Sequence, residues 1–284
     1  SAAAGGSTGQ GLARGALIVF FLAHTPACPA AFFGAVRAGF VPVLLNTQAT
    51  PDLLRFFVAD TGARLAVCEA SLSEIFDDPE MQANGLERTI VVNGSGPLGG
   101  PFEHAADFLA GQPETLAAAD TGPNDMAFWM YSSGSTGRPK GIVHLHHDMA
   151  YTRASYADAI LKLAPGDVCF SIPKIFFAYG FGNAFTFPFS VGATTVLMPG
   201  RPEAERVLDV IEAYKPTVLF GLPTLYTALA RADRVAGRDL SSIRLSVSAA
   251  EILSADVFNA WKDLTGNGPV EGLGSTELLH VYLS

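Results

Sequence analysis

The sequence predicts an α/β fold in which mostly parallel sheets are flanked by helices. Short apolar runs with strand-like composition alternate with longer segments of helical periodicity along most of the chain. Hydrophobic residues make up 49% of the 284 residues and charged residues only 16%, a balance that indicates a globular enzyme core. A chain of this length can bury a substantial core, as one large unit or as two domains.

The first half of the chain begins the alternation. Residues 1–11 are small, polar and glycine-rich, which predicts a loop. A helix is expected over 29–38. A second helix should begin after the N-cap residue Thr50, with Pro51 at the first helical position, and should run through Val58. The strands expected in this half are 16–23, 41–45, 65–68 and 89–92.

The second half continues in the same way. One helix is expected after His147, another from Pro202 to Pro216, and a third between the last two strands. The helix after Pro202 should bury one face, formed by Val207, Leu208, Ile211 and Tyr214. The strands expected in this half are 126–131, 168–172, 194–198, 218–220 and 245–247.

Charge and cysteine content exclude several classes of protein. The formal net charge of −9 makes nucleic acid an unlikely partner. The three cysteines are far apart and form no CxxC pair, which favours neither a disulfide framework nor a cysteine zinc site. The longest apolar run, 16–23, is shorter than the roughly 20 residues that span a bilayer. We therefore expect a cytoplasmic protein without a nucleic-acid or membrane partner.

Two glycine-rich segments differ in what they predict. Residues 94–99 satisfy GxGxxG after a strand, but Pro97 and the Gly-Pro pair that follows do not open a helix, so a surface loop is the better interpretation. Residues 131–141, YSSGSTGRPKG, offer four hydroxyls and backbone amides that glycines can turn toward one centre. Lys140 adds a positive charge suited to phosphate.

The segment 131–141 is therefore predicted to bind phosphate, with a merely flexible Gly/Ser loop as the alternative. It is not a Walker loop, because Gly141 and not Ser or Thr follows Lys140, and it contains no GxSxG nucleophile elbow. Downstream, His144, His146 and His147 lack the spacing and the carboxylates of a zinc site. Support of the loop is the expected role of these histidines.

Five segments carry a resemblance to a known family. YSSGSTGRPKG closely resembles the signature loop of the adenylate-forming superfamily, which includes acyl-CoA synthetases, peptide-synthetase adenylation domains and luciferases. Residues 248–251 resemble the family's adenine-side loop, and 271–277 resemble its later segment that ends in Thr-Glu. Residues 173–183, together with 277–284, are similar to the benzoate-CoA ligase branch.

The resemblance covers residues 16–284 and implies the layered core of the family's N-terminal domain, incomplete at both ends. It implies a first α/β subdomain over 1–120 and a second over 121–284 that holds the phosphate loop and the acyl pocket. The ribose-binding Asp, the hinge and the small C-terminal domain with its catalytic Lys are expected to be missing. The chain alone is therefore expected to lack full activity.

The resemblance also implies a ligase of aromatic acid catabolism. A benzoate, or a small substituted benzoate, would attack the α-phosphate of ATP to form an acyl-adenylate, and coenzyme A would then displace AMP; Mg²⁺ would assist. Two alternatives stay open: an adenylating enzyme that passes another acid to a carrier protein, and a domain that only binds nucleotide or aryl acid. The oligomeric state is also open, with a dimer as one option.

The resemblance assigns residues to the nucleotide. Thr276 would donate its hydroxyl to the α-phosphate, Glu277 would hold Mg²⁺, and Lys140 would join them as a catalytic residue. The terminal phosphates would lie against Ser132, Ser133, Gly134, Ser135, Thr136, Gly137 and Lys140. The adenine and ribose would lie against Ser248, Ala249, Ala250, Glu251, Glu271 and Gly272.

The acyl pocket is expected to be flat and apolar. One wall would consist of Ala178, Tyr179 and Gly180, and the other of Gly272, Gly274, His280 and Val281, where the glycines leave room for a ring. Plain core packing is the alternative for the aromatic stretch 176–189. Two positions depart from the family pattern: Phe177 stands where many relatives carry His, and Val281 stands where benzoate ligases favour Ile. The smaller Val281 would admit ring substituents.

Overall fold

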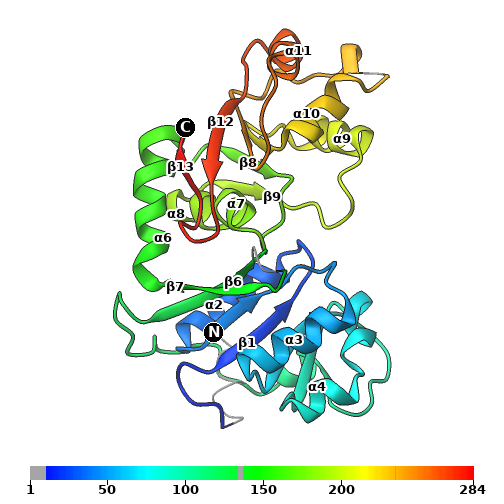
Figure 1. Ribbon diagram of the computed structural model, residues 1–284, viewed down its shortest axis with the longest axis vertical. Helices are drawn as coiled ribbons and strands as arrows, with labels where there is room; N and C mark the ends of the chain where they lie inside the picture. Colours follow the sequence, from blue (N-terminus) through cyan, green and yellow to red (C-terminus); the bar gives the residue numbers. More distant parts are fainter. Residues whose placement is uncertain (1–10, 134–136, 234) are drawn as a thin grey trace. The chain divides into compact units, whose positions relative to one another are not determined.

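The computed structural model describes residues 11–133, 137–233 and 235–284, and it divides the chain into two compact units. The first unit ends at His147 and the second begins at Asp148. Each unit contains one sheet with helices on both faces, which confirms the predicted α/β class (Figure 1).

The sheet of the first unit has the strand order β5-β4-β3-β1-β2-β6-β7. All neighbouring strands are parallel except β6 and β7, which form an antiparallel hairpin. The strands are β1 (Leu17–Phe21), β2 (Val41–Leu44), β3 (Leu65–Glu69), β4 (Arg88–Val92), β5 (Phe102–His104), β6 (Met126–Ser132) and β7 (Lys140–Leu145).

Helices cover both faces of this sheet. They are α2 (Ala27–Arg37), α3 (Pro51–Thr61), the 3-10 helix η1 (Ala70–Phe76), α4 (Pro79–Ala83) and α5 (Ala105–Leu109). As predicted, Thr50 caps α3: its side chain accepts a hydrogen bond from the Leu53 amide, and Pro51 occupies the first turn. The buried Leu54, Phe57 and Val58 pack α3 against Val19 and Val43 on one face of the sheet.

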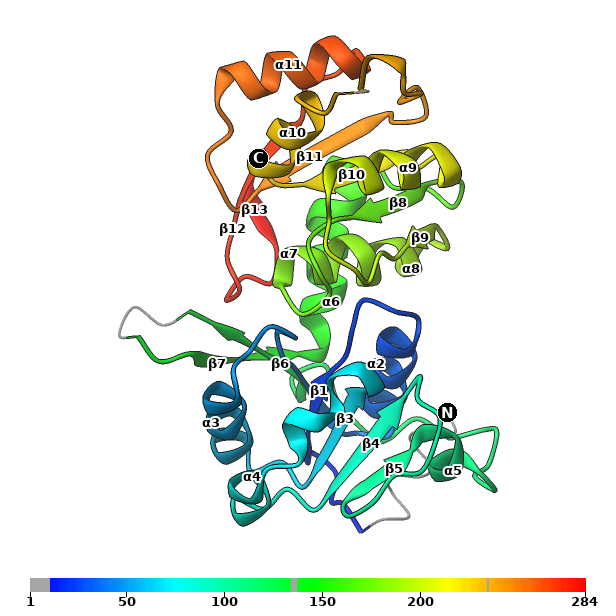
Figure 2. The same ribbon diagram turned by 90° about the vertical axis from the view of Figure 1, so that its right-hand side faces the viewer.

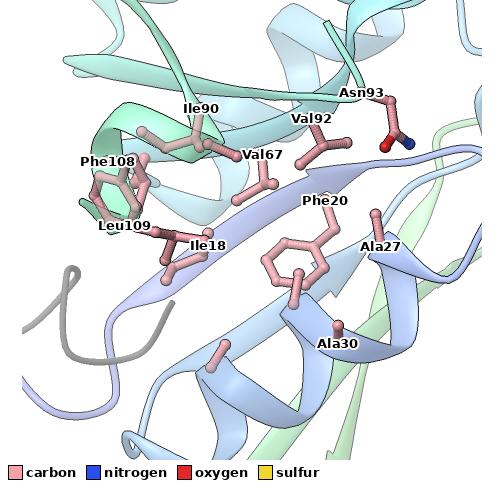
Figure 3. A pocket seen from close by; sticks show the side chains of 14 residues that line it. Ile18, Phe20, Ala27, Ala30, Val67, Ile90, Val92, Asn93, Phe108 and Leu109 are labelled. Carbon is pink, nitrogen blue, oxygen red and sulfur yellow. The ribbon is translucent and has the colours of Figure 1, made fainter. Parts of the chain in front are cut away.

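The opposite face of this sheet is hollowed. Figure 3 shows an apolar cavity of about 430 Å³ between α2 and the strands β1, β3 and β4, with α5 at one end. Asn93 is the one polar side chain among its lining residues. Among the described residues that line this cavity, none is one that the sequence assigns to a ligand.

The sheet of the second unit has the order β13-β12-β11-β10-β8-β9, and only the β12–β13 pair is antiparallel. Its strands are β8 (Val168–Ser171), β9 (Thr194–Val196), β10 (Val218–Gly221), β11 (Leu245–Ala249), β12 (Val270–Gly274) and β13 (Val281–Leu283). The α-helices are α6 (His146–Thr152), which starts at the unit boundary, α7 (Ala178–Phe181), α8 (Phe187–Val191), α9 (Ala204–Tyr214), α10 (Pro223–Ala230) and α11 (Ala255–Thr265). Two π-helices, η2 (Arg153–Leu161) and η3 (Gly182–Thr186), and one 3-10 helix, η4 (Val235–Gly237), complete the unit.

The central strands of this sheet bury both faces, which explains their continuous apolar runs. Phe170 and Leu219 face α9, α10 and α11, where Trp261 is fully buried. On the other side of the sheet, where Figure 2 shows α8, Cys169 and Phe220 pack against buried residues of η2 and α8.

The structure confirms each predicted strand and departs from the sequence expectations at several points. The unit boundary follows His147 and not residue 120, because β6 pairs with β2 and extends the first sheet. The helix after Pro202 begins at Ala204, and its Tyr214 is 62% exposed, although Val207, Leu208 and Ile211 are buried. The strands β5, β7, β12 and β13 were not predicted. Residues 94–99 are an exposed loop, as expected.

The three cysteines are buried free thiols, and burial raises the pKa of each to about 12. Within the described residues, we found no helix with both the length and the apolar composition needed to cross a membrane.

Candidate functional site

The predicted phosphate loop connects the two strands of the β6–β7 hairpin. Tyr131 pairs with Gly141 and Ser132 with Lys140, so the hairpin ladder continues to both ends of the loop. Ser133 and Lys140 are exposed at these ends. Gly137 has a φ of +86°, a conformation that favours glycine. Gly134, Ser135 and Thr136 lie outside the described residues.

Tyr131 ties the start of this loop to α3. Its hydroxyl donates a hydrogen bond to Asp60 Oδ2 over 2.6 Å, and its ring lies 4.3 Å from the Phe57 ring, centroid to centroid. Burial and the hydrogen bond to Asp60 both raise the pKa of Tyr131, so the hydroxyl keeps its proton. Across the hairpin, a Cβ at position 141 would lie 3.1 Å from the Trp129 ring, so a larger residue there would require this ring to shift slightly.

His144, near the end of β7, and His147, in α6, have different partners. His144 is buried and its ring stacks on Phe128 with centroids 4.9 Å apart, whereas His147 Nδ1 is hydrogen bonded to the Pro123 carbonyl over 2.9 Å. In the described part of the chain, no group of three or more His, Cys, Asp or Glu side chains could hold a metal ion.

In the second unit, the two segments assigned to adenine and ribose lie side by side. Ser248 of β11 pairs with Glu271 of β12, and Ala249 pairs with Gly272. Directly after β11, Ala250 has a φ of +73°, which turns the chain sharply out of the sheet. The parallel register therefore places both segments at the carboxyl edge of the same sheet, where α/β proteins bind ligands.

Both glutamates at this edge brace nearby backbone. Glu251 accepts hydrogen bonds from the Thr224 amide and hydroxyl over 3.3 and 3.4 Å, at the start of α10. Glu271 Oε1 accepts from the Leu253 amide over 2.9 Å. Each carboxylate is exposed and keeps further acceptor capacity for a ribose or water.

Thr276 and Glu277 lie in the tight turn between β12 and β13. The Leu279 amide donates to the Thr276 carbonyl over 3.0 Å, and the Ser275 amide donates to the His280 carbonyl over 3.3 Å. Leu279 has a φ of +65°, so the turn holds a strained, fixed shape. The Glu277 side chain is exposed on it, and Thr276 is partly buried.

His280 connects the two predicted walls of the acyl pocket. It is only 2% exposed, and its ring lies 5.4 Å from Tyr179, 5.0 Å from Tyr156 and 4.6 Å from Phe187, centroid to centroid. Burial lowers the pKa of His280 to about 3, although a hydrogen bond with the Tyr179 backbone opposes this shift. The imidazole is therefore neutral near pH 7.

The glycines of the acyl segments give room to protein atoms. A Cβ at Gly272 would lie 2.8 Å from both methyl groups of Val281, and a Cβ at Gly274 would lie 2.8 Å from the His280 carbonyl oxygen. At Gly180, a Cβ would lie 2.1 Å from the Lys174 carbonyl oxygen. These glycines permit the close approach of β13 and of α7.

A cavity of about 400 Å³ lies next to this cluster, between η2 and β13. Val281 is the one predicted acyl residue that lines it, together with Tyr156, Ile160 and Leu283. Ala178, on the opposite wall, is buried at the start of α7, and Tyr179 donates its hydroxyl to the Val247 carbonyl over 3.1 Å.

The predicted residues therefore fall into two groups. Those of the phosphate loop belong to the first unit, and those for adenine, α-phosphate and acyl group belong to the second. Sequence reasoning assigned no role to Asp60, Thr224 or Asn183, whose partners lie 71, 27 and 97 residues away along the chain. No local pattern marks such long-range contacts.

The chain is similar to several known proteins. Residues 2–284 match the family model described as AMP-binding enzyme. The chain is 41% identical over 257 residues to the benzoate–CoA ligase of Thauera aromatica, an alignment that covers 90% of this chain and 48% of the relative. It is 40% identical over 268 residues to the 4-hydroxybenzoate–CoA/benzoate–CoA ligase of Rhodopseudomonas palustris, with 94% and 49% covered.

Among solved structures, the anthranilate CoA ligase AuaEII in complex with anthranoyl-AMP superimposes with a TM-score of 0.93 at 35% identity. This match covers 99% of the present chain and 54% of AuaEII. The chain thus spans about half the length of the relatives that it matches.

Proposed function

The chain belongs to the AMP-binding enzyme family, and on this premise we propose that the whole protein activates an aromatic carboxylate with ATP and transfers it to coenzyme A. The substrate would be benzoate or a small substituted benzoate. The observation that carries this proposal is the aromatic cluster around neutral His280, which lies directly after the Thr276–Glu277 turn. The names of the relatives, which act on benzoate, hydroxybenzoate and anthranilate, support an aromatic acid.

The cluster suits an uncharged ring. Tyr156, Tyr179 and Phe187 surround His280 with apolar rings, and His280 adds no charge at neutral pH, so the cluster contains no charge that would attract the substrate carboxylate. The carboxylate would instead point toward the Thr276–Glu277 turn, where it meets the α-phosphate.

The first half-reaction brings two anions together, so its barrier depends on stabilising negative charge on the transferring phosphoryl group. The Thr276 hydroxyl would donate to the α-phosphate, and Lys140 with Ser132 and Ser133 would hold the departing pyrophosphate. Glu251 and Glu271, which keep free acceptor capacity, would bind the ribose side. Displacement of AMP by the coenzyme A thiol completes the reaction.

The residues present fit one Mg²⁺ ion. Glu277 is a single exposed carboxylate on a fixed turn, and magnesium is commonly held by one or two carboxylates plus substrate phosphates and water. When bound, the ion would neutralise charge on the phosphate oxygens.

ATP–pyrophosphate exchange by the full-length protein tests the proposal. Exchange that depends on benzoate, hydroxybenzoate or anthranilate, and not on acetate or a long-chain fatty acid, is expected. A second assay should compare coenzyme A with a phosphopantetheinyl carrier protein as the acceptor. Exchange with none of the aromatic acids would refute the aryl assignment, and transfer only to the carrier would favour the alternative acceptor.

A further inference from the structure

Gly182 and Asn183 follow α7 and begin the π-helix η3, and neither has a role in the function proposed above. Both are fully enclosed: Asn183 is 0% exposed, and every residue of η3 is buried. A π-helical turn is rare and often marks a functional site. Both side-chain positions face the imidazole of His280, and that of Gly182 also faces the Phe187 ring.

The first contact is steric. A Cβ at position 182 would lie 2.5 Å from His280 Cδ2, 2.9 Å from His280 Nε2 and 2.9 Å from Phe187 Cε2, a ring that itself packs on His280. Such distances are far below van der Waals contact, so any larger residue at 182 must displace these rings. The imidazole therefore lies against bare backbone at this position.

The second contact is a hydrogen bond. His280 Nε2 lies 2.9 Å from Asn183 Oδ1, and both groups are buried. Because the imidazole is neutral, an amide oxygen at this distance selects the tautomer that carries its proton on Nε2. Asn183 thus determines both the tautomer and the rotation of the ring.

We propose that Gly182 and Asn183 are positioning residues that fix the His280 ring and thereby shape the surface against which the aromatic acid lies. This inference deepens the proposed function and rests on it. Neither residue needs to touch the substrate; both act through His280, whose ring contacts three further aromatic rings.

The decisive variant is Asn183→Leu in the full-length protein, which keeps the side-chain volume and removes the acceptor. KM for the aromatic acid should rise about tenfold, because one buried hydrogen-bonding group loses its partner, while KM for ATP should stay unchanged. Gly182→Ala should act in the same direction. Gly166→Ala is the matched control, because a Cβ there meets nothing within 4 Å and its φ is not positive.

A second variant separates positioning from general stability. Asn183→Asp keeps an acceptor oxygen but adds a negative charge beside His280, which should raise the pKa of His280 from about 3. KM for the aromatic acid should then become pH-dependent near neutrality, a change that simple loss of packing would not produce. A wild-type pH profile in Asn183→Asp, or equal changes in both KM values in Asn183→Leu, would overturn the proposal.

The imidazole itself offers a readout that needs no turnover. In ¹⁵N-histidine spectra of the full-length protein, assigned with His280→Gln, His280 should show the Nε2-protonated tautomer, and Asn183→Leu should lose it. An unchanged His280 spectrum in Asn183→Leu would show that Asn183 does not determine the His280 tautomer, even if the wild-type protein activated aromatic acids. Absence of exchange in the wild type would instead refute the proposed function and leave the spectra to test the coupling.

Discussion

Tyr131 and Asp60 join the start of the predicted phosphate loop to the last turn of α3 through one hydrogen bond of 2.6 Å. The ring of the same tyrosine packs on Phe57, also from α3. Two separate interactions therefore fix the position where the loop leaves β6.

Tyr131→Phe in the full-length protein should keep the ring contact and lose the hydrogen bond. We expect a loss of about 0.5–1 kcal/mol in stability and a rise in KM for ATP of a few fold, because the loop is held less firmly. Thermal unfolding and exchange kinetics measure the two effects. Tyr214→Phe, at a tyrosine that is 62% exposed, is the matched control. If Tyr131→Phe and Tyr214→Phe had the same KM for ATP, the role of the Tyr131 hydroxyl in anchoring the loop would be contradicted.

Thr276→Ala and Glu277→Ala should each slow the first half-reaction by about 10²-fold, because each removes a group that would meet the phosphate charge or its Mg²⁺. Benzoate-dependent exchange in the full-length enzyme measures the loss. Glu203→Ala, which removes an exposed glutamate at the start of α9, is the control for loss of a carboxylate. Wild-type exchange in the Thr276 or Glu277 variant would reject the role of that residue.

Gly272→Ala should destabilise the protein by about 1–3 kcal/mol, since its Cβ would lie 2.8 Å from both methyl groups of Val281. The double variant Gly272→Ala/Val281→Ala should recover most of this loss, because the second substitution removes the clashing methyls. Denaturant unfolding of the single and double variants measures the coupling. Strictly additive losses would show that the two side chains do not share this space.

Val281→Ile should narrow the aryl site by one methylene. The ratio of kcat/KM for a ring-substituted benzoate to that for benzoate should fall about tenfold, since one methylene in an apolar pocket is worth about that much discrimination. Val210→Ile, on α9, is the matched control and should leave the ratio unchanged. An unchanged kcat/KM ratio in Val281→Ile would show that the substrate ring does not lie against Val281.

Stability should fall in acid through Asp167, which is 6% exposed. Burial by itself would raise the pKa of Asp167, but hydrogen bonds from Arg244 (2.6 and 2.8 Å), Thr217 and the Ala164 amide lower it to about 2. A carboxyl with a lowered pKa stabilises the fold above its unfolded pKa of about 3.9, and this contribution disappears as pH falls toward about 2.

Arg244→Ala should therefore cost about 1–2 kcal/mol at pH 7, after allowance for solvent around the guanidinium, and the difference from wild type should shrink between about pH 4 and pH 2. Denaturant unfolding across this range measures it. Lys215→Ala, which breaks an exposed ion pair with Asp239, should change stability little. If the difference in stability between Arg244→Ala and wild type did not change with pH, the Arg244–Asp167 ion pair would not be its source.

The sequence by itself determined the α/β class, the strands with continuous apolar runs and the three motifs of the site, because periodicity, caps and short motifs are local. Thr50 and Pro51 marked the start of α3, and 131–141 indicated phosphate binding before any fold was known. The strands β7 and β12 escaped prediction because their glycines and polar side chains resemble those of loops, and β5 and β13 because each has only three residues. Hydrogen bonds to a neighbouring strand make them strands.

Only the tertiary structure decided what depends on residues that are distant in sequence. The boundary moved to His147 because β6 pairs with β2, more than 80 residues earlier. The space beside Gly272 is occupied by Val281, and the space beside Gly274 by the His280 backbone, since strand pairing determines which atoms lie over a glycine. His280, which looked like one wall residue among several, became the centre of an aromatic cluster because α7, η3 and β13 meet there, and no local rule specifies such a meeting.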